Sequence, residues 1–171
     1  VPDSQDFGSV TDIFARRFSP IAYQENEADV VFKDADDNPI QSVRPLGSEF
    51  RVNTFTTNAQ SEPSVGMDDD GNFVIAWRNE GQDLSFFNGI TAQRYNRDGE
   101  RLGSEFMVNT EDTYQHWEPY VGVAHDGHFA ISWARTHDTR VLPPTSHLSM
   151  VMVEIYDPEG NTLVEQFPNG V

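Results

Sequence analysis

The sequence predicts an all-β protein built from antiparallel four-stranded meander repeats, on three observations. Shifting the 171-residue sequence by 56 positions aligns Gly47–Trp77 with Gly103–Trp133, and 17 of the 31 aligned residues are identical. Each copy contains a β-branched and aromatic run of strand length, Phe73–Trp77 in the first, beside turn-forming Asp, Asn and Gly residues. No segment shows the roughly 3.6-residue apolar period of an amphipathic helix. We therefore expect strands and tight turns, with minimal helix.

The strands of one repeat are expected in succession along the chain. Gly71 and Gly99 provide the positive φ that tight turns need, one after the first strand and one after the third. Tight turns join antiparallel neighbours, so the four strands form a meander. The predicted strands are Pro63–Met67, Phe73–Trp77, Ile90–Tyr95 and Arg101–Val108.

Partial copies flank the two long ones. Asp12–Phe18 resembles Gly89–Tyr95, and Met150–Tyr156 occupies the same place after the second long copy. The N-terminal copy thus predicts a third and a fourth strand without the first two. The insert between them, about residues 19–45, contains a further predicted strand, Asp29–Phe32.

A four-stranded meander repeated every 50 to 60 residues, roughly, is typical of β-propeller blades. The chain holds about ten strands, whereas a closed propeller needs at least about four blades of four strands. We therefore expect an incomplete propeller in one chain, within one structural domain overall. Either the chain is a fragment, or copies of it assemble, or the roughly ten strands form an open stack or sandwich. The parts of the chain are a partial blade with an insert at 1–46, a blade at 47–108 and a blade at 109–171.

The repeat pattern resembles secreted bacterial repeats of the form G-x-E-F-x-V-N-T, then D-x-D-G-x-F-V-V-x-W, then I-x-A-Q-R-Y. The resemblance covers residues 47–133 well, and 9–18 and 148–167 more loosely. It implies a propeller-type fold and an extracellular, repeat-containing context. It does not specify an activity.

Composition excludes several partners. Asp and Glu number 28 against 11 Lys and Arg, so the net charge is −17, which opposes binding to nucleic acid or to anionic membrane surfaces. No apolar run approaches the roughly 20 residues of a membrane helix, so we expect no membrane insertion. The lack of Cys excludes disulfides and thiolate chemistry. We predict an extracellular, cell-surface or periplasmic protein.

One cluster of residues predicts a ligand-binding surface. Trp117 differs from its repeat counterpart Ser61 and is expected in a loop with Tyr114 and His116, while the following loop, residues 134–149, carries Arg135 and Arg140. Trp beside His and acidic groups suits carbohydrate, and packing of Trp117 under its own loop is the alternative. The predicted ligand-binding residues are Tyr114, His116, Trp117, Arg135 and His137. The recurring Trp77 and Trp133, by contrast, are expected in the core.

Metal binding has two sets of candidates. Asp34, Asp36 and Asn38 place oxygen ligands at alternate positions, as a calcium loop does, so calcium is the candidate cofactor. The Asp68–Asn72 segment offers a similar cluster, and a solvated turn is the alternative at both places. The five histidines lie between 116 and 147. In a meander blade His125 and His128 lie at one end and His116, His137 and His147 at the other, so we expect scattered surface histidines in preference to a three-histidine site.

These observations favour a non-catalytic extracellular β-repeat module for adhesion, surface structure or assembly. Its expected partners are further copies of itself or the remaining blades of a longer parent. A carbohydrate-binding propeller module is the alternative, and a fragment of a glycoside-acting propeller enzyme is a third. Glu62 and Glu118 recur, but we expect them too far apart for a glycosidase pair, and expect structural roles such as pairing with Arg78 or Arg135.

Overall fold

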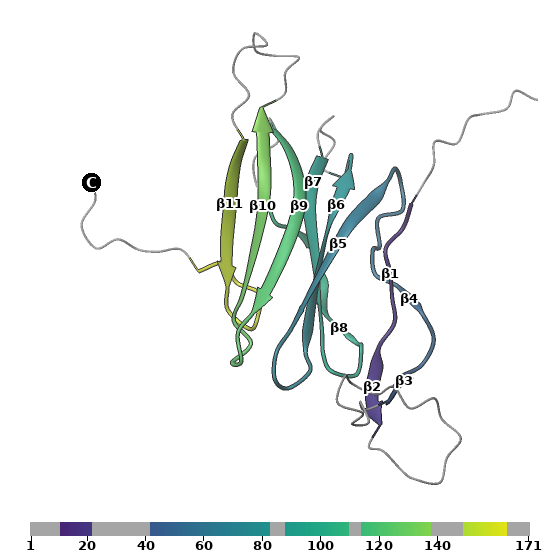
Figure 1. Cartoon of the computed structure of the whole chain (residues 1–171). Coiled ribbons are helices and arrows are strands. Elements are labelled where there is room, and N and C mark those ends of the chain that lie inside the picture. Colours follow the sequence, from purple (N-terminus) through teal and green to yellow (C-terminus); the bar gives the residue numbers. More distant parts are fainter. Residues whose placement is uncertain (1–10, 22–41, 83–87, 110–113, 138–148, 164–171) are drawn as a thin grey trace, which may run out of the picture. The chain divides into compact units, whose positions relative to one another are not determined.

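The computed structural model describes residues 11–21, 42–82, 88–109, 114–137 and 149–163 (Figure 1). Every regular element in these ranges is a β-strand, and all strand pairs are antiparallel. The all-β prediction is therefore confirmed. Within the same ranges, no helix is long and apolar enough to cross a membrane.

The first sheet is the predicted meander. It contains β5 (Gln60–Met67), β6 (Phe73–Glu80), β7 (Asn88–Tyr95) and β8 (Arg101–Met107), paired in the order β5-β6-β7-β8. The prediction was short at three ends, because β5 begins three residues before Pro63, β6 continues to Glu80 and β7 begins at Asn88. The pairing of β5 with β6 is interrupted between Ser61 and Ser64, so Glu62 and Pro63 form an irregularity inside the strand.

The second sheet repeats three of these strands: β9 (Tyr114–Val123), β10 (Phe129–His137) and β11 (Ser149–Tyr156), in the order β11-β10-β9. A single bridge pairs Tyr156 with Thr162, and the Leu163 N–H donates to the Ile155 carbonyl at 2.7 Å. These contacts copy the start of the β7–β8 pairing, where Tyr95 faces Arg101. The residues after Leu163 lie outside the described part of the chain.

One core lies between the two sheets. The first sheet contributes Val74, Ala76, Ile90 and Ala92, and the second contributes Phe129, Ile131, Trp133 and Tyr156. Phe129 stacks on Tyr156 at 4.7 Å between ring centroids. Each strand alternates, so the second sheet has an inner face, on this core, and an outer face that points the other way. Trp77 and Trp133 are buried, which confirms their predicted core positions.

The repeated Val-Asn motif fixes the chain after each fourth strand. The Val108 N–H donates to the Ile90 carbonyl, and Asn109 Oδ1 accepts the Ile90 N–H at 2.7 Å. Val52 and Asn53 make the same two bonds, both at 2.8 Å, to Ile13. These bonds explain why the repeat carries Val-Asn at this place.

Residues Phe14–Arg51 form a separate compact unit. In it, β1 (Phe14–Ala15) pairs with β4 (Phe50–Arg51), and β2 (Phe18–Ile21) pairs with β3 (Ser42–Pro45). The β1–β4 pairing is the one predicted for a third and a fourth strand. The predicted strand Asp29–Phe32 lies outside the described residues. Among the described strands the sheets stay open, without closure into a propeller ring.

Candidate functional site

His116 has a structural partner. It lies within β9, not in the predicted loop, and is 1% exposed. Its Nδ1 accepts a hydrogen bond from Trp133 Nε1 at 2.9 Å. Gln60, its repeat counterpart, is also buried and accepts from Trp77 Nε1 at 3.0 Å. The imidazole therefore does in the second sheet what a neutral amide does in the first.

A pocket of about 190 Å³ opens beside this pair. Trp133 and His116 line it together with charged groups from β10 and β11. Glu154, one of these, accepts a hydrogen bond from the Tyr156 hydroxyl at 2.9 Å. Burial, with the Glu154 contact, raises the pKa of Tyr156. The lining residues are Val108, Asn109, His116, Trp133, Arg135, Met152, Val153 and Glu154.

Three predicted ligand-binding residues meet at this end of the second sheet. His116 faces Arg135 across the β9–β10 pairing, and the Arg135 guanidinium lies 4.2 Å from the centre of the Tyr114 ring. The backbone of His137 pairs with Tyr114, and its side chain lies outside the described atoms. Arg135 and His116 line the pocket, so the structure brings these predicted residues close together. Arg135 and His137 lie in β10 and not in the predicted loop.

Trp117 points to a different place. Like His116 it lies in β9, not in a loop, and its Nε1 donates to Thr136 Oγ1 at 3.3 Å. The Arg78 guanidinium of the first sheet lies 4.4 Å from the centre of its ring. One ring face is therefore covered by a cation, and Trp117 belongs to the junction between the two sheets.

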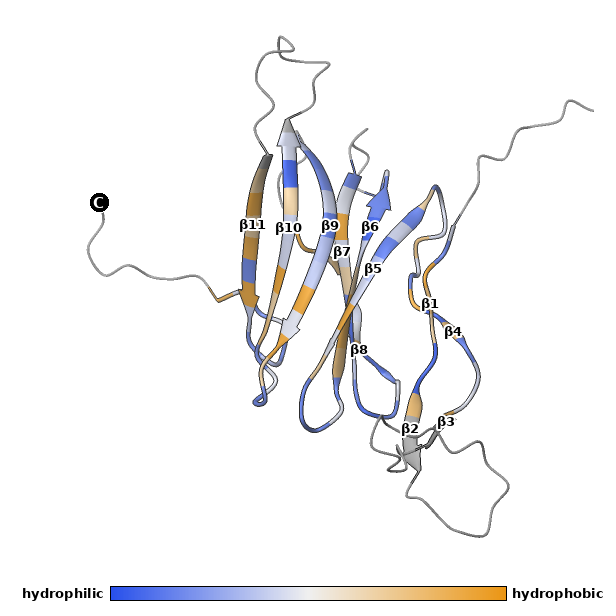
Figure 2. Ribbon diagram, in the orientation of Figure 1, coloured by the Kyte–Doolittle hydropathy of each residue, from blue (hydrophilic) through white to orange (hydrophobic). Residues whose placement is uncertain are grey.

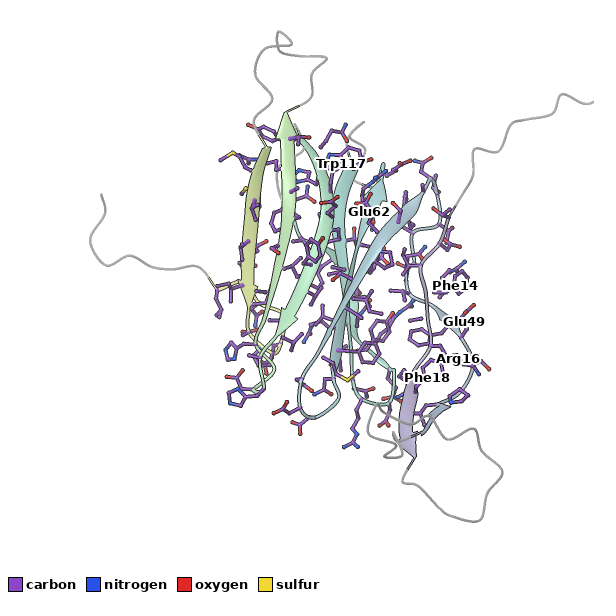
Figure 3. The ribbon with its side chains drawn as sticks, viewed as in Figure 1. Phe14, Arg16, Phe18, Glu49, Glu62 and Trp117 are labelled. Atoms are coloured by element: carbon purple, nitrogen blue, oxygen red, sulfur yellow. The ribbon has the colours of Figure 1, made fainter. Side chains whose placement is uncertain are left out.

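Glu62, one of the two recurrent glutamates, lies at the same junction, and Figure 3 labels it together with Trp117. Glu62 Oε1 pairs with Arg78 at 2.6 Å, and Glu62 Oε2 accepts the Glu118 backbone N–H at 2.8 Å. The expected pairing with Arg78 is confirmed. The Glu62 side chain reaches the Glu118 backbone, so the two residues are in contact. The expectation that their carboxylates are too far apart for a glycosidase pair stays a prediction. Glu62 thus joins one sheet to the next.

The sequence analysis did not identify the outer face of the second sheet, to which β11, a largely hydrophobic strand in Figure 2, contributes exposed side chains. In β11, Val151, Val153 and Ile155 are 79%, 58% and 49% exposed. Tyr120, on β9, is 64% exposed. The sequence contained a signal for this apolar face. At the positions where β7 carries Ile90, Ala92 and Arg94, β11 carries only apolar β-branched residues.

The acidic turns show turn chemistry. Asp68 accepts hydrogen bonds from the Asn72 backbone and side chain at 2.8 and 2.9 Å, and Asp157 does the same with Asn161. The Asn161 contacts lower the pKa of Asp157, and the His128 N–H lowers that of Asp126. Within the described residues no group of three or more His, Asp or Glu is arranged to hold a metal. The calcium candidates Asp34, Asp36 and Asn38, and His147, lie outside those residues.

Comparison of the chain with protein-family models and with curated proteins finds no match to either.

Proposed function

We propose that this chain is a non-catalytic β-repeat module of propeller-type blades that functions by assembly, in the extracellular space, at the cell surface or in the periplasm. The observation that supports it is the exposed outer face of β9–β11. Ile90 and Ala92 of the first sheet are 0% exposed because the second sheet covers them, whereas their counterparts Val151 and Val153 are largely exposed. A contiguous apolar sheet face of this kind marks an interaction surface.

The burial also agrees with a role in which sheets stack. In the core, the aromatic inner face of the second sheet packs against a face of the first sheet that carries the smaller side chains Val74, Ala76, Ile90 and Ala92. In such an array, stability comes from neighbour-to-neighbour contacts, so a terminal sheet gains by acquiring a neighbour. Repetition and open ends fit a structural or adhesive module better than an enzyme with one catalytic centre.

Light scattering after size exclusion, from micromolar to millimolar protein, tests this proposal on the intact chain. We expect the mass to rise with concentration. Val153→Glu should weaken the association at least tenfold, roughly, since it places an unpaired carboxylate in the interface. Ser104→Glu, which adds the same charge at an exposed position of β8, is the control. A strict monomer at every concentration would count against the proposal.

Carbohydrate binding is the second candidate, and the pocket beside Trp133 favours it. His116, Arg135 and Glu154 supply polar groups there next to an indole ring. At about 190 Å³ the pocket is smaller than the roughly 300–1,000 Å³ of drug-sized sites, so it would hold little more than one sugar ring. Glycan-array binding that Arg135→Ala removes would support this candidate. Silence on every glycan would end it.

A further inference from the structure

Two glycines at the same repeat position differ in their surroundings. A methyl group added at Gly66, on β5, would lie 2.8 Å from Val123 Cγ2 and 3.0 Å from Val121 Cγ1, so the close approach of β9 requires glycine there. A methyl group added at Gly122 would meet nothing within 4 Å. Neither glycine has a positive φ. Glycine inside a strand weakens it and typically marks a place where another chain segment comes close. On the side where a Gly122 methyl group would lie, the described molecule therefore leaves open space.

Two glutamates show the same contrast. Glu62 and Glu118 both adopt a positive φ, 54° and 52°, directly before a proline. This conformation is unfavourable for a residue with a side chain, so surrounding contacts must stabilise it. In Glu62 the carboxylate binds Arg78 and the Glu118 N–H. Glu118 has the same backbone conformation and is exposed.

The third feature is the chemistry of the outer face. In the first sheet, Arg94 donates a hydrogen bond to the Pro158 carbonyl of the second sheet, and Arg78 covers Trp117. Ile155 and Ala134 replace these two arginines in the second sheet. The outer face of β9–β11 is therefore more apolar than the face that already binds a neighbour.

From these features we infer the partner: the outer face of β9–β11 binds a further blade of this same repeat, in the stagger that the first sheet shows toward the second. This inference rests on the proposed function and adds the identity of the occupant. The incoming blade places its first strand against Gly122, as Val121 and Val123 lie against Gly66. It presents a backbone N–H to the Glu118 carboxylate, and its aromatic second strand covers Val151 and Val153.

Contact between two copies of the outer face is the competing arrangement. It would bury the same valines, but it would bring together two faces that both lack the aromatic strand. In such a dimer, no backbone N–H of the partner would face the Glu118 carboxylate in the way that the Glu118 N–H faces the Glu62 carboxylate. The two arrangements therefore differ in their dependence on Glu118 and Gly122.

The test is an extended chain, in which residues 1–163 are followed directly by a second copy of residues 103–163. The junction keeps the strand register, because Leu163 occupies the place of Leu102 beside the third strand. Hydrogen exchange is measured on the parent and on the extended chain. We expect the amides of β11 and of Tyr120–Val123 to exchange more slowly in the extended chain.

Paired substitutions then identify the contacts. Gly122→Ala should leave the unfolding midpoint of the parent unchanged or raise it, and should lower that of the extended chain. Glu118→Gln should likewise lower only the extended chain's midpoint. Gly66→Ala, the matched control, should lower the midpoint of both chains.

The outcomes separate this inference from the proposed function. The inference is overturned if the β11 amides of the extended chain remain unprotected. It is also overturned if Gly122→Ala and Glu118→Gln change the unfolding midpoint equally in both chains. If the parent still associates and Val153→Glu weakens it, the proposed function stands with a different occupant. The parent could fail to associate while Gly122→Ala lowers the unfolding midpoint of the extended chain alone. That result would support a further blade as the partner and would rule out self-association of the parent.

Discussion

Replacing His116 tests whether the core of the second sheet requires a hydrogen-bond acceptor for the Trp133 indole. His116→Leu keeps the approximate volume but removes the acceptor of the Trp133 Nε1 hydrogen bond. The indole N–H is then buried without this partner, since His116 is 1% and Trp133 6% exposed. An unsatisfied buried donor costs about 1–3 kcal/mol. For a chain of this size that corresponds to about 2–12 °C in the unfolding midpoint.

His116→Gln is the informative partner variant, because the first sheet already uses this pairing between Gln60 and Trp77. We expect it to stay within about 1 kcal/mol of the parent. Urea unfolding followed by tryptophan fluorescence and by circular dichroism gives both free energies of unfolding. Equal losses in the Leu and Gln variants would refute the view that an acceptor for the indole is what this position requires.

Three further predictions concern the junction, the tyrosines and the net charge. Arg78→Met should lower the free energy of unfolding by about 1–3 kcal/mol, since Glu62 loses its ion pair and Trp117 loses its covering cation. Arg78→Lys should recover less than half of this loss, because an ammonium group cannot form bidentate hydrogen bonds or stack on a ring. Full recovery by Lys in urea unfolding would contradict this. Burial raises the pKa of both Tyr95 and Tyr156, so the unfolded chain loses these protons first and stability falls above about pH 10, by up to about 1.4 kcal/mol per pH unit for each tyrosine. Tyr156→Phe should make that fall shallower in alkaline titrations of the melting temperature, and an unchanged slope would speak against it. With a net charge of −17, lowering the ionic strength to about 10 mM should destabilise the protein, and an unchanged melting temperature there would refute the electrostatic argument.

The sequence predicted the sheets well because their signals are local. The run Phe73–Trp77 and the glycine turns fix strand and turn positions without reference to the rest of the chain. The strand starts were harder to predict, since Pro63 suggested a beginning where the structure has an irregularity inside β5. The positive φ of Glu62 and its bond to the second sheet are tertiary features, and no local pattern encodes them.

The candidate site was predicted in part for a related reason. His116 was predicted in a loop because Pro119, like Pro63, suggested the start of the strand, whereas β9 begins at Tyr114. The burial of His116 follows from an acceptor placed 17 residues before a core tryptophan, as in Gln60 and Trp77, and that spacing was available in the sequence. The separation of Trp117 from His116 follows from strand alternation, since neighbours in a strand point to opposite faces. Once β9 is known to begin at Tyr114, that separation is determined.

The boundaries of the sequence repeat do not coincide with the boundaries of a sheet, and this offset affects how such chains change in length. The unit Gly103–Trp133 spans most of β8, the last strand of one sheet, and then β9 and part of β10 of the next. A gene segment copied at these boundaries carries residues from two neighbouring sheets. Unequal recombination between copies would thus add or delete whole sheets while leaving every remaining junction with both of its sides intact. Length variation among such proteins would then cost no interface, and copy number can drift without redesign of the contacts.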